Sequence, residues 1–201
     1  MTRSVSLTGG GPEAVRRRAE EESVRRQFEK DAVWSRMIAP GGRVPDLPLI
    51  EVDLGPIHLR RLLHTGPLVL VFFRYAGSAP CEDALGAYER TLAPACADLG
   101  AHLVAVSPQR AERLTPVKHH NDLSYLVAAD PRHALIDAFG IGYPEPEATE
   151  RLGTRRSILP YPSVVVADRT GIVRYADVHP STAARTPAAP IIASLRHATQ
   201  R

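Results

Sequence analysis

The sequence predicts an α/β domain in which helices flank a mixed central sheet, preceded by an N-terminal helical extension. Apolar runs at 67–73, 102–106 and 163–167 have the length and the β-branched content of buried strands. Helical spacing follows the first run, and such alternation indicates parallel strands with helices on both faces. A turn sequence at 168–171, Asp-Arg-Thr-Gly, adds a late antiparallel hairpin.

Composition fits one domain with extensions. The chain has 201 residues, of which 44% are hydrophobic, enough for an ordinary core. Its formal net charge is +3, and the basic residues form no stripe with interleaved aromatics, so we expect no nucleic-acid binding. The N-terminus is too charged for a signal peptide, and no apolar run approaches the roughly 20 residues that span a membrane. We expect a cytoplasmic protein with reduced thiols.

The N-terminal region predicts an amphipathic helix. Residues 1–11 are expected to be a flexible start, and Pro12 can open a helix that continues to about Met37. Val24, Phe28 and Ala32 recur every four residues along one side, which Trp34 and Met37 extend. This side packs on its own domain or on a second subunit, and we expect a homodimer. We divide the chain into an extension, 1–40, and a domain, 41–201.

The other predicted elements follow from local periodicity and from turn residues. A hairpin is expected at 45–59 around Asp53-Leu54-Gly55, with a helical turn at 59–64. The remaining expectations are helices at 81–99, 110–120 (interrupted by Pro116), 131–139 and 191–197, and strands at 124–128 and 172–176. The stretch 143–160 lacks clear periodicity, so we interpret it as an insertion loop that can hold a helical turn.

The tetrapeptide Ser78-Ala79-Pro80-Cys81 lies where the first apolar strand ends and the following helix begins. Unpaired N–H groups and the macrodipole favour an anion at a helix N-terminus. A thiol there can become a thiolate, which is the reactive form. The sequence therefore makes Cys81 a candidate nucleophile, with a small buried hydrophobic residue as the alternative.

The order of elements resembles the thioredoxin fold, and more closely its peroxiredoxin branch of the alkyl-hydroperoxide-reductase and thiol-specific-antioxidant type. The resemblance covers about Val44 to Val178. The segments that carry it are 68–74, 78–81, 99–109, Asp130 with 138–140, and 162–171. The resemblance implies that Cys81 reduces a peroxide and becomes a sulfenic acid, with Ser78 as its hydrogen-bonding partner. It implies an external thiol reductant and no metal or organic cofactor.

The chain departs from the family pattern at its candidate site. Arg74 stands where peroxiredoxins usually have a proline, and Pro162 stands where they usually have an active-site arginine. Aligned to relatives with a Cys-Pro-x-Cys motif, Ser78 replaces the first cysteine and Cys81 keeps the second. Cys81 is then the buried, inert member of a lost pair. Two alternatives therefore stay open: a redox-inactive scaffold, and an enzyme of a specialised pathway repurposed for a small organic substrate.

The remaining candidate residues surround Cys81 in this interpretation. We expect Arg74 to supply the positive charge near the thiolate, in place of the missing arginine. Pro162 is expected to be a cis proline that lines the site, and Tyr75 and Tyr161 are candidates for the walls of the pocket.

Cys96 and a pair of histidines are interpreted as structural. Cys81 and Cys96 share one helical stripe with Leu85, Tyr88 and Leu92. The two sulfurs are therefore about 22 Å apart along the helix, too far for a disulfide. The adjacent His119 and His120 point apart and have no third ligand nearby, so we expect no metal site.

Overall fold

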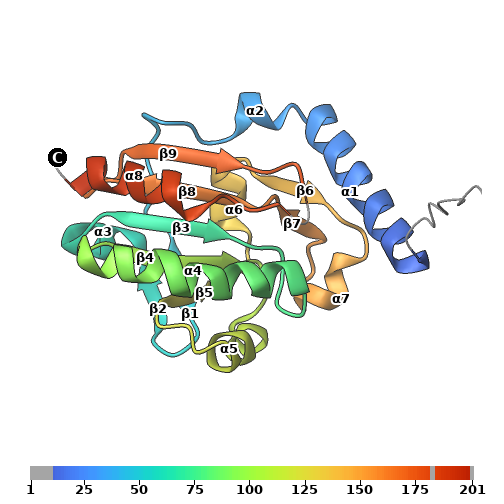
Figure 1. Cartoon of the computed structure of the whole chain (residues 1–201), viewed down its shortest axis with the longest axis horizontal. Coiled ribbons are helices and arrows are strands. Elements are labelled where there is room, and N and C mark those ends of the chain that lie inside the picture. Colours follow the sequence, from blue (N-terminus) through green and yellow to red (C-terminus); the bar gives the residue numbers. More distant parts are fainter. Residues whose placement is uncertain (1–10, 182–183, 200–201) are drawn as a thin grey trace, which may run out of the picture.

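A seven-stranded mixed sheet runs through the molecule (Figure 1). The computed structural model describes residues 11–181 and 184–199. The strands of the sheet are β1 (Pro48–Glu51), β2 (Gly55–His58), β3 (Leu68–Phe72), β4 (His102–Ser107), β5 (Leu126–Ala129), β8 (Ser163–Ala167) and β9 (Val173–Val178). Their order is β2-β1-β5-β4-β3-β8-β9. β3, β4 and β5 are parallel, and the other neighbours are antiparallel, which confirms the predicted mixed sheet.

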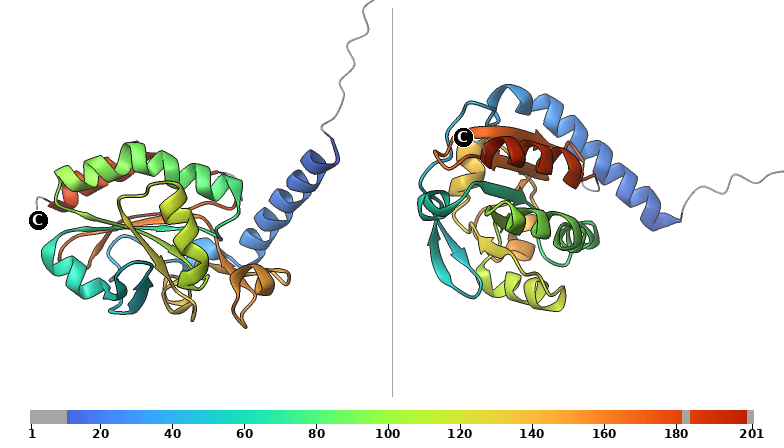
Figure 2. Two further views of the ribbon diagram at one scale, coloured as in Figure 1. Left: turned by 90° about the horizontal axis from the view of Figure 1, so that it is seen from below. Right: turned by 60° about the vertical axis from the view of Figure 1, so that its left-hand side comes forward.

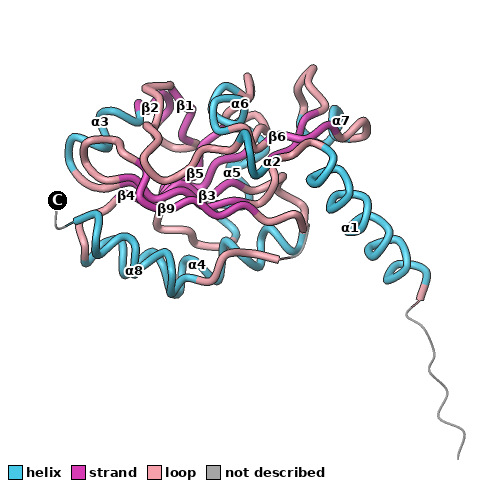
Figure 3. Tube along the Cα trace, turned by 90° about the horizontal axis from the view of Figure 1, so that it is seen from above, coloured by secondary structure: helices cyan, strands magenta, loops and turns pink. Residues whose placement is uncertain are grey.

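Helices cover both faces of the sheet. They are α3 (Leu59–Thr65), α4 (Ala79–Asp98), α5 (Ala111–His120), α6 (Ala134–Phe139) and α8 (Ala188–Thr199). Successive side chains of a strand point to opposite faces, so the two faces build separate cores. In β3, Val69 and Val71 belong to the core with α4, α5 and α8. Leu70 and Phe72 belong to the core with α3 and α6. Figure 3 shows α4 and α8 together on one side of the sheet.

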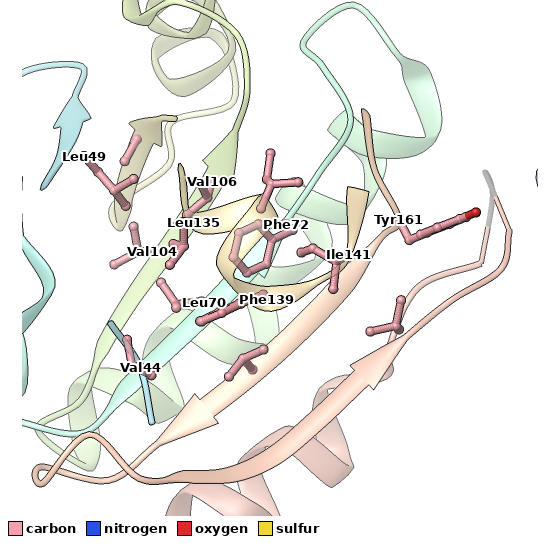
Figure 4. Packing of buried hydrophobic residues seen from close by; sticks show 14 of the residues in the cluster. Val44, Leu49, Leu70, Phe72, Val104, Val106, Leu135, Phe139, Ile141 and Tyr161 are labelled. Atoms are coloured by element: carbon pink, nitrogen blue, oxygen red, sulfur yellow. The ribbon is translucent and has the colours of Figure 1, made fainter. Parts of the chain in front are cut away.

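The core with α3 and α6 is built around aromatic packing. Phe72 of β3 meets Phe139 of α6 edge to face, with 5.5 Å between ring centroids. Ile141 follows α6 and is fully buried in the same cluster (Figure 4). Gly140 lets this region close up, because a Cβ there would lie 2.4 Å from the carbonyl oxygen of Arg36. Its φ of +66° also favours glycine.

The N-terminal region forms two helices rather than the single predicted one. α1 (Pro12–Lys30) ends before Ala32, whose φ of 45° is left-handed, and α2 (Val33–Arg36) follows. Val24 and Phe28 are buried as predicted, whereas Trp34 is 63% exposed. Figure 2 shows α1 reaching away from the rest of the molecule. The expected flexible start lies almost wholly outside the described residues, and the proposed division at residue 40 stays a prediction.

The stretch interpreted as an insertion loop has regular structure. β6 (Gly142–Pro144) pairs antiparallel with β7 (Ile158–Pro160), and α7 (Ala148–Leu152) lies between them. The expected helical turn is therefore confirmed, but the loop interpretation of its flanks is wrong. The sequence does not predict these short strands because Pro144 and Pro160 interrupt the alternation that indicates a strand.

The helix α5 differs from the prediction at Pro116. It continues past this residue as a helix although the proline removes one helical hydrogen bond.

No helix among the described residues has both the length and the apolar character needed to cross a membrane.

Candidate functional site

Cys81 lies in the first turn of α4, as the sequence predicts. Ser78 is the residue before the first helical position, and Pro80 occupies the second, where a proline loses no helical hydrogen bond. The Cys81 N–H donates to the Ser78 carbonyl oxygen at 2.8 Å. The hydroxyl of Ser78 makes no capping hydrogen bond to the helix. The Ser78 hydroxyl is therefore not used to cap α4. Its hydrogen bond to the sulfur stays a prediction.

The side chain of Cys81 is fully buried, with 0% of the residue exposed. This burial is what the alternative interpretation of Cys81 as a small buried hydrophobic residue expects, and the role of nucleophile stays a prediction. The physical reason is the predicted helical stripe, because Leu85, Tyr88, Leu92 and Cys96 are all buried with Cys81 on the inner face of α4. Cys81 therefore lies on the face of α4 that packs on the sheet, in the core that α4 shares with α8.

A guanidinium group contacts this buried sulfur, and it belongs to Arg185. Its Nη2 donates to Cys81 Sγ at 3.3 Å. Arg185 lies between β9 and α8 and is itself only half-buried. The first turn of α4 and the Arg185 guanidinium therefore meet at this sulfur. Sequence reasoning missed Arg185, because nothing local in the sequence indicates a contact across 104 residues.

The segment around Arg185 is held against α4 by its neighbour Thr186. The Thr186 carbonyl oxygen accepts a hydrogen bond from the hydroxyl of Tyr88 at 2.7 Å. The Thr186 hydroxyl donates to Asp177 Oδ2 at 2.9 Å. Burial raises the pKa of Tyr88 to about 12, so this phenol stays protonated and keeps donating at neutral pH. These contacts fix where Arg185 meets the sulfur.

Arg74, the expected source of positive charge, points to a different partner. Its Nη2 donates to Glu20 Oε1 of α1 at 2.7 Å, and its side chain is 4% exposed. Its guanidinium also lies 5.3 Å from the centroid of the Tyr75 ring. Arg74 therefore ties the end of β3 to α1, and the contact to Cys81 that was expected of it is made by Arg185.

Pro162 and Tyr161 also differ from expectation. No cis peptide bond occurs among the described residues, so Pro162 is trans and the predicted cis geometry is wrong. Its carbonyl oxygen accepts from the N–H of His179 at 2.8 Å, beside a strand that is interior to the sheet. Tyr161 packs on Phe28 and Tyr143. It belongs to the core cluster drawn in Figure 4, whereas Cys81 belongs to the cluster on the other face of the sheet. Tyr161 therefore does not wall a pocket at the sulfur.

Tyr75 does line a cleft, of about 560 Å³. The cleft lies between the loop after β3, the start of α4, α5 and the end of α7. Glu82 contributes to its wall, but the neighbouring Cys81 does not. Of the sequence-predicted site residues, Tyr75 alone is among those that line it. The cleft and the sulfur are thus on different sides of the first turn of α4.

The second cysteine and the histidine pair have structural surroundings. Both cysteines are free thiols, and burial raises the pKa of Cys96 to about 12. His119 Nε2 lies 3.0 Å from Asp53 Oδ1, and His120 lines the cleft. Within residues 11–181 and 184–199, no group of three or more His, Cys, Asp or Glu is arranged to hold a metal ion.

Comparisons with known proteins agree with the observed topology. The AhpC/TSA family model matches residues 40–176 of the chain. No curated protein sequence matches it. Among solved structures, the fold is similar to peroxidoxin BcpB from Mycobacterium tuberculosis. The TM-score is 0.67 at 22% identity, and the match covers 80% of this chain and 97% of that one.

Two further solved structures are similar at lower identity. Peroxiredoxin Q of Xanthomonas campestris matches with a TM-score of 0.62 at 17% identity, over 76% of this chain and 91% of that one. The mitochondrial 1-Cys peroxiredoxin of yeast matches with a TM-score of 0.62 at 14% identity, over 78% and 74% of the two chains. At these identities the likeness establishes the fold. It confirms the predicted thioredoxin-like architecture of peroxiredoxin type.

Proposed function

Because the chain belongs to the AhpC/TSA family, we propose that it is a one-cysteine thiol peroxidase in which Cys81 reduces a peroxide. The observation that carries the proposal is the contact between Arg185 Nη2 and Cys81 Sγ at 3.3 Å. A guanidinium is permanently charged and donates best to an anion, so it stabilises the thiolate that the reaction requires. Arg185 thereby takes the place of the family arginine that Pro162 cannot supply.

The proposed reaction begins with the Cys81 thiolate. The sulfur attacks one peroxide oxygen, an S–O bond forms, and the O–O bond breaks. The sulfur loses two electrons and becomes a sulfenic acid, and the leaving oxygen takes a proton and departs as water or an alcohol. Arg185, next to the sulfur, is placed to stabilise the charge that moves onto oxygen. Ser78 is the second candidate donor, since its hydroxyl does not cap α4.

Regeneration of Cys81 requires a thiol from outside the chain. Cys96 lies in the same helix, about 22 Å further along its axis, and a disulfide needs Cα atoms within ~7 Å. A first external thiol condenses with the sulfenic acid and releases water. A second thiol attacks the external sulfur of this mixed disulfide, so that a disulfide forms between the two external thiols and the Cys81 thiolate is released. Thiol resolution through glutathione and thioredoxin systems is named for the yeast 1-Cys peroxiredoxin, whose fold is similar.

The proposed reaction also requires that a peroxide can reach the sulfur of Cys81. Cys81 is fully buried, whereas Arg185 is partly exposed and touches it. We propose that movement of the Arg185 side chain, or of the segment that carries it, opens the sulfur to solvent. We place the enzyme in the cytoplasm, where reducing thiols are abundant, and as a homodimer.

A second function is favoured by one observation, the complete burial of Cys81. Ser78 occupies the position before α4 where the relatives with two cysteines have their first one, and Cys81 then corresponds to the inert second member. In this case the chain is a redox-inactive family member that binds a partner or a small organic molecule.

Peroxide consumption separates the two functions. Purified protein is mixed with hydrogen peroxide and excess dithiothreitol, and the peroxide that remains is measured with time. The peroxidase function predicts catalytic consumption by wild type and by Cys96→Ser, and its loss in Cys81→Ser. Consumption at the background rate by wild type, or equal consumption by wild type and Cys81→Ser, contradicts it.

A further inference from the structure

The cleft of about 560 Å³ beside α4 lies at the carboxyl ends of β3 and β4. These strands are parallel, and open α/β sheets bind ligands at the carboxyl ends of such strands. The loop after β3 and the residue Gln109 after β4 form one side, and α5 and α7 form the others. The cleft does not include Cys81, so nothing in the proposed peroxidase reaction explains it.

A buried glutamine holds the rim of this cleft together. Gln109 is 3% exposed, and its Oε1 accepts from the Ala76 N–H at 2.7 Å. Its Nε2 donates to the Arg151 carbonyl oxygen at 2.8 Å. One side chain thus joins the loop after β3 to the end of α7. The cleft is therefore preformed, as small-molecule sites usually are.

Two guanidinium groups at the cleft have no carboxylate partner among the residues that the structure describes. Arg113 Nη1 donates to the Arg151 carbonyl oxygen at 3.2 Å. Arg151 Nη1 donates to the Tyr75 hydroxyl at 3.2 Å, and its guanidinium lies 5.5 Å from the centroid of the Tyr75 ring. Each guanidinium keeps further N–H donors that these single contacts do not use.

The net charge of the lining is +1, because two arginines face one acid, Glu82, when His120 is counted as neutral. The Glu82 carboxylate already accepts the Gly77 N–H at 2.7 Å. A ligand with one negative charge balances this lining, whereas a dianion overcompensates it. The rest of the wall includes the Tyr75 ring, Pro116 and Val117, which offer apolar contact.

We propose that this cleft binds a small organic carboxylate with an apolar or aromatic body. The carboxylate lies between the guanidinium groups of Arg113 and Arg151, whose planar N–H donors match its two oxygens. The body of the ligand packs on Tyr75, Pro116 and Val117. Binding requires no redox chemistry at Cys81, so this proposal stands or falls separately from the peroxidase function.

Benzoate tests this proposal as a minimal aromatic monoanion. Its binding to the full chain is measured by isothermal titration calorimetry and by saturation-transfer NMR, beside benzamide and phenyl phosphate. We expect saturable benzoate binding that weakens with added salt, and benzamide affinity lower by roughly tenfold or more because the charge is missing. Absence of saturable benzoate binding, or phenyl phosphate binding in its place, overturns the proposal.

Matched arginine variants locate the site. Arg151→Gln removes a guanidinium that, among the described residues, hydrogen-bonds the Tyr75 hydroxyl and lies over the Tyr75 ring, and we expect benzoate affinity to fall by about tenfold. Arg90→Gln makes the same charge change at an exposed position of α4 outside the cleft, and it should bind like wild type. Equal benzoate affinity in the Arg151→Gln and wild-type proteins overturns the assignment, as does an equal loss in the Arg90→Gln control. Circular dichroism confirms that each variant is folded.

Discussion

The guanidinium of Arg185 lies 3.3 Å from the sulfur of Cys81 and joins the segment before α8 to the first turn of α4. The contact gives a buried thiol a charged neighbour that an ordinary core cysteine lacks. The proposed function gives this partly exposed side chain two roles, to stabilise the thiolate and to cover the sulfur.

Removing the charge of Arg185 tests its role in stabilising the thiolate. We expect Arg185→Gln to lower the second-order rate of Cys81 oxidation by hydrogen peroxide by roughly tenfold, because the anion loses a charge-assisted hydrogen bond. The rate is followed by stopped-flow tyrosine fluorescence or by timed quenching and mass spectrometry. Arg196→Gln, at an exposed position of α8, is the control and should keep the wild-type rate. An unchanged rate in Arg185→Gln removes the arginine from the mechanism.

Loosening the segment that carries Arg185 tests its role as a cover. Tyr88→Phe deletes the hydroxyl that donates to Thr186, and it should lower the free energy of unfolding by about 1 kcal/mol. It should also speed modification of Cys81 by an aromatic disulfide reagent. The control, Tyr125→Phe, deletes the hydroxyl that donates to Leu85 of the same helix. It should cost similar stability without speeding modification, and equal rates in both variants contradict the role as a cover.

The buried carboxylate of Glu51 predicts a pH-dependent contribution to stability. Burial favours the neutral acid, but Lys118 Nζ at 2.6 Å and three backbone N–H groups outweigh it and lower the pKa of Glu51. A carboxyl with a lowered pKa in the folded state contributes stability above its unfolded pKa and loses it as the pH falls. Glu51→Gln should therefore cost about 2 kcal/mol at pH ~7.

Urea unfolding of wild type and Glu51→Gln at several pH values measures this effect. The difference in unfolding free energy should be full near neutrality. It should shrink as the pH falls below ~4.3, where the unfolded carboxyl takes up a proton. A difference that stays constant through this range shows that the charge of Glu51 contributes nothing. Asp53→Asn, which changes an exposed partner of the same lysine, should have a much smaller effect.

Cys96 should be inert in the folded protein. It is buried in α4, and burial raises its pKa to about 12, so almost no thiolate is present at neutral pH. We expect the Cys81→Ser variant to show no thiol reactive toward an alkylating reagent until urea unfolds it. A thiol that reacts at the native rate of Cys81 in this variant would place the reactive sulfur at Cys96.

Most of the fold could be predicted because its signals are local. The apolar runs that form β3, β4 and β8 are buried strands, and the stripe from Cys81 to Cys96 is the inner face of α4. Two differences come from single backbone positions. The left-handed φ of Ala32 separates α1 from α2. Pro144 and Pro160 break the alternation of apolar residues from which the strands β6 and β7 could have been predicted.

The candidate site could be predicted less fully because its key contact is not local. The sequence places Cys81 at the start of a helix, but which guanidinium reaches the sulfur depends on how α8 packs beside α4. Arg74 is nearer in sequence, yet Glu20 of α1 attracts it instead. The same stripe that predicts Cys96 as a core residue also buries Cys81.

Direct trapping of the oxidised sulfur tests the central claim most sharply. Wild-type protein, Cys81→Ser and Cys96→Ser are treated with stoichiometric hydrogen peroxide at neutral pH in the presence of a dimedone probe, and the labelled peptides are identified by mass spectrometry. The account predicts one probe on Cys81 in wild type and in Cys96→Ser, and none in Cys81→Ser. Unlabelled Cys81 in wild type, even at millimolar peroxide, contradicts the assignment of this sulfur as a peroxide-reducing nucleophile.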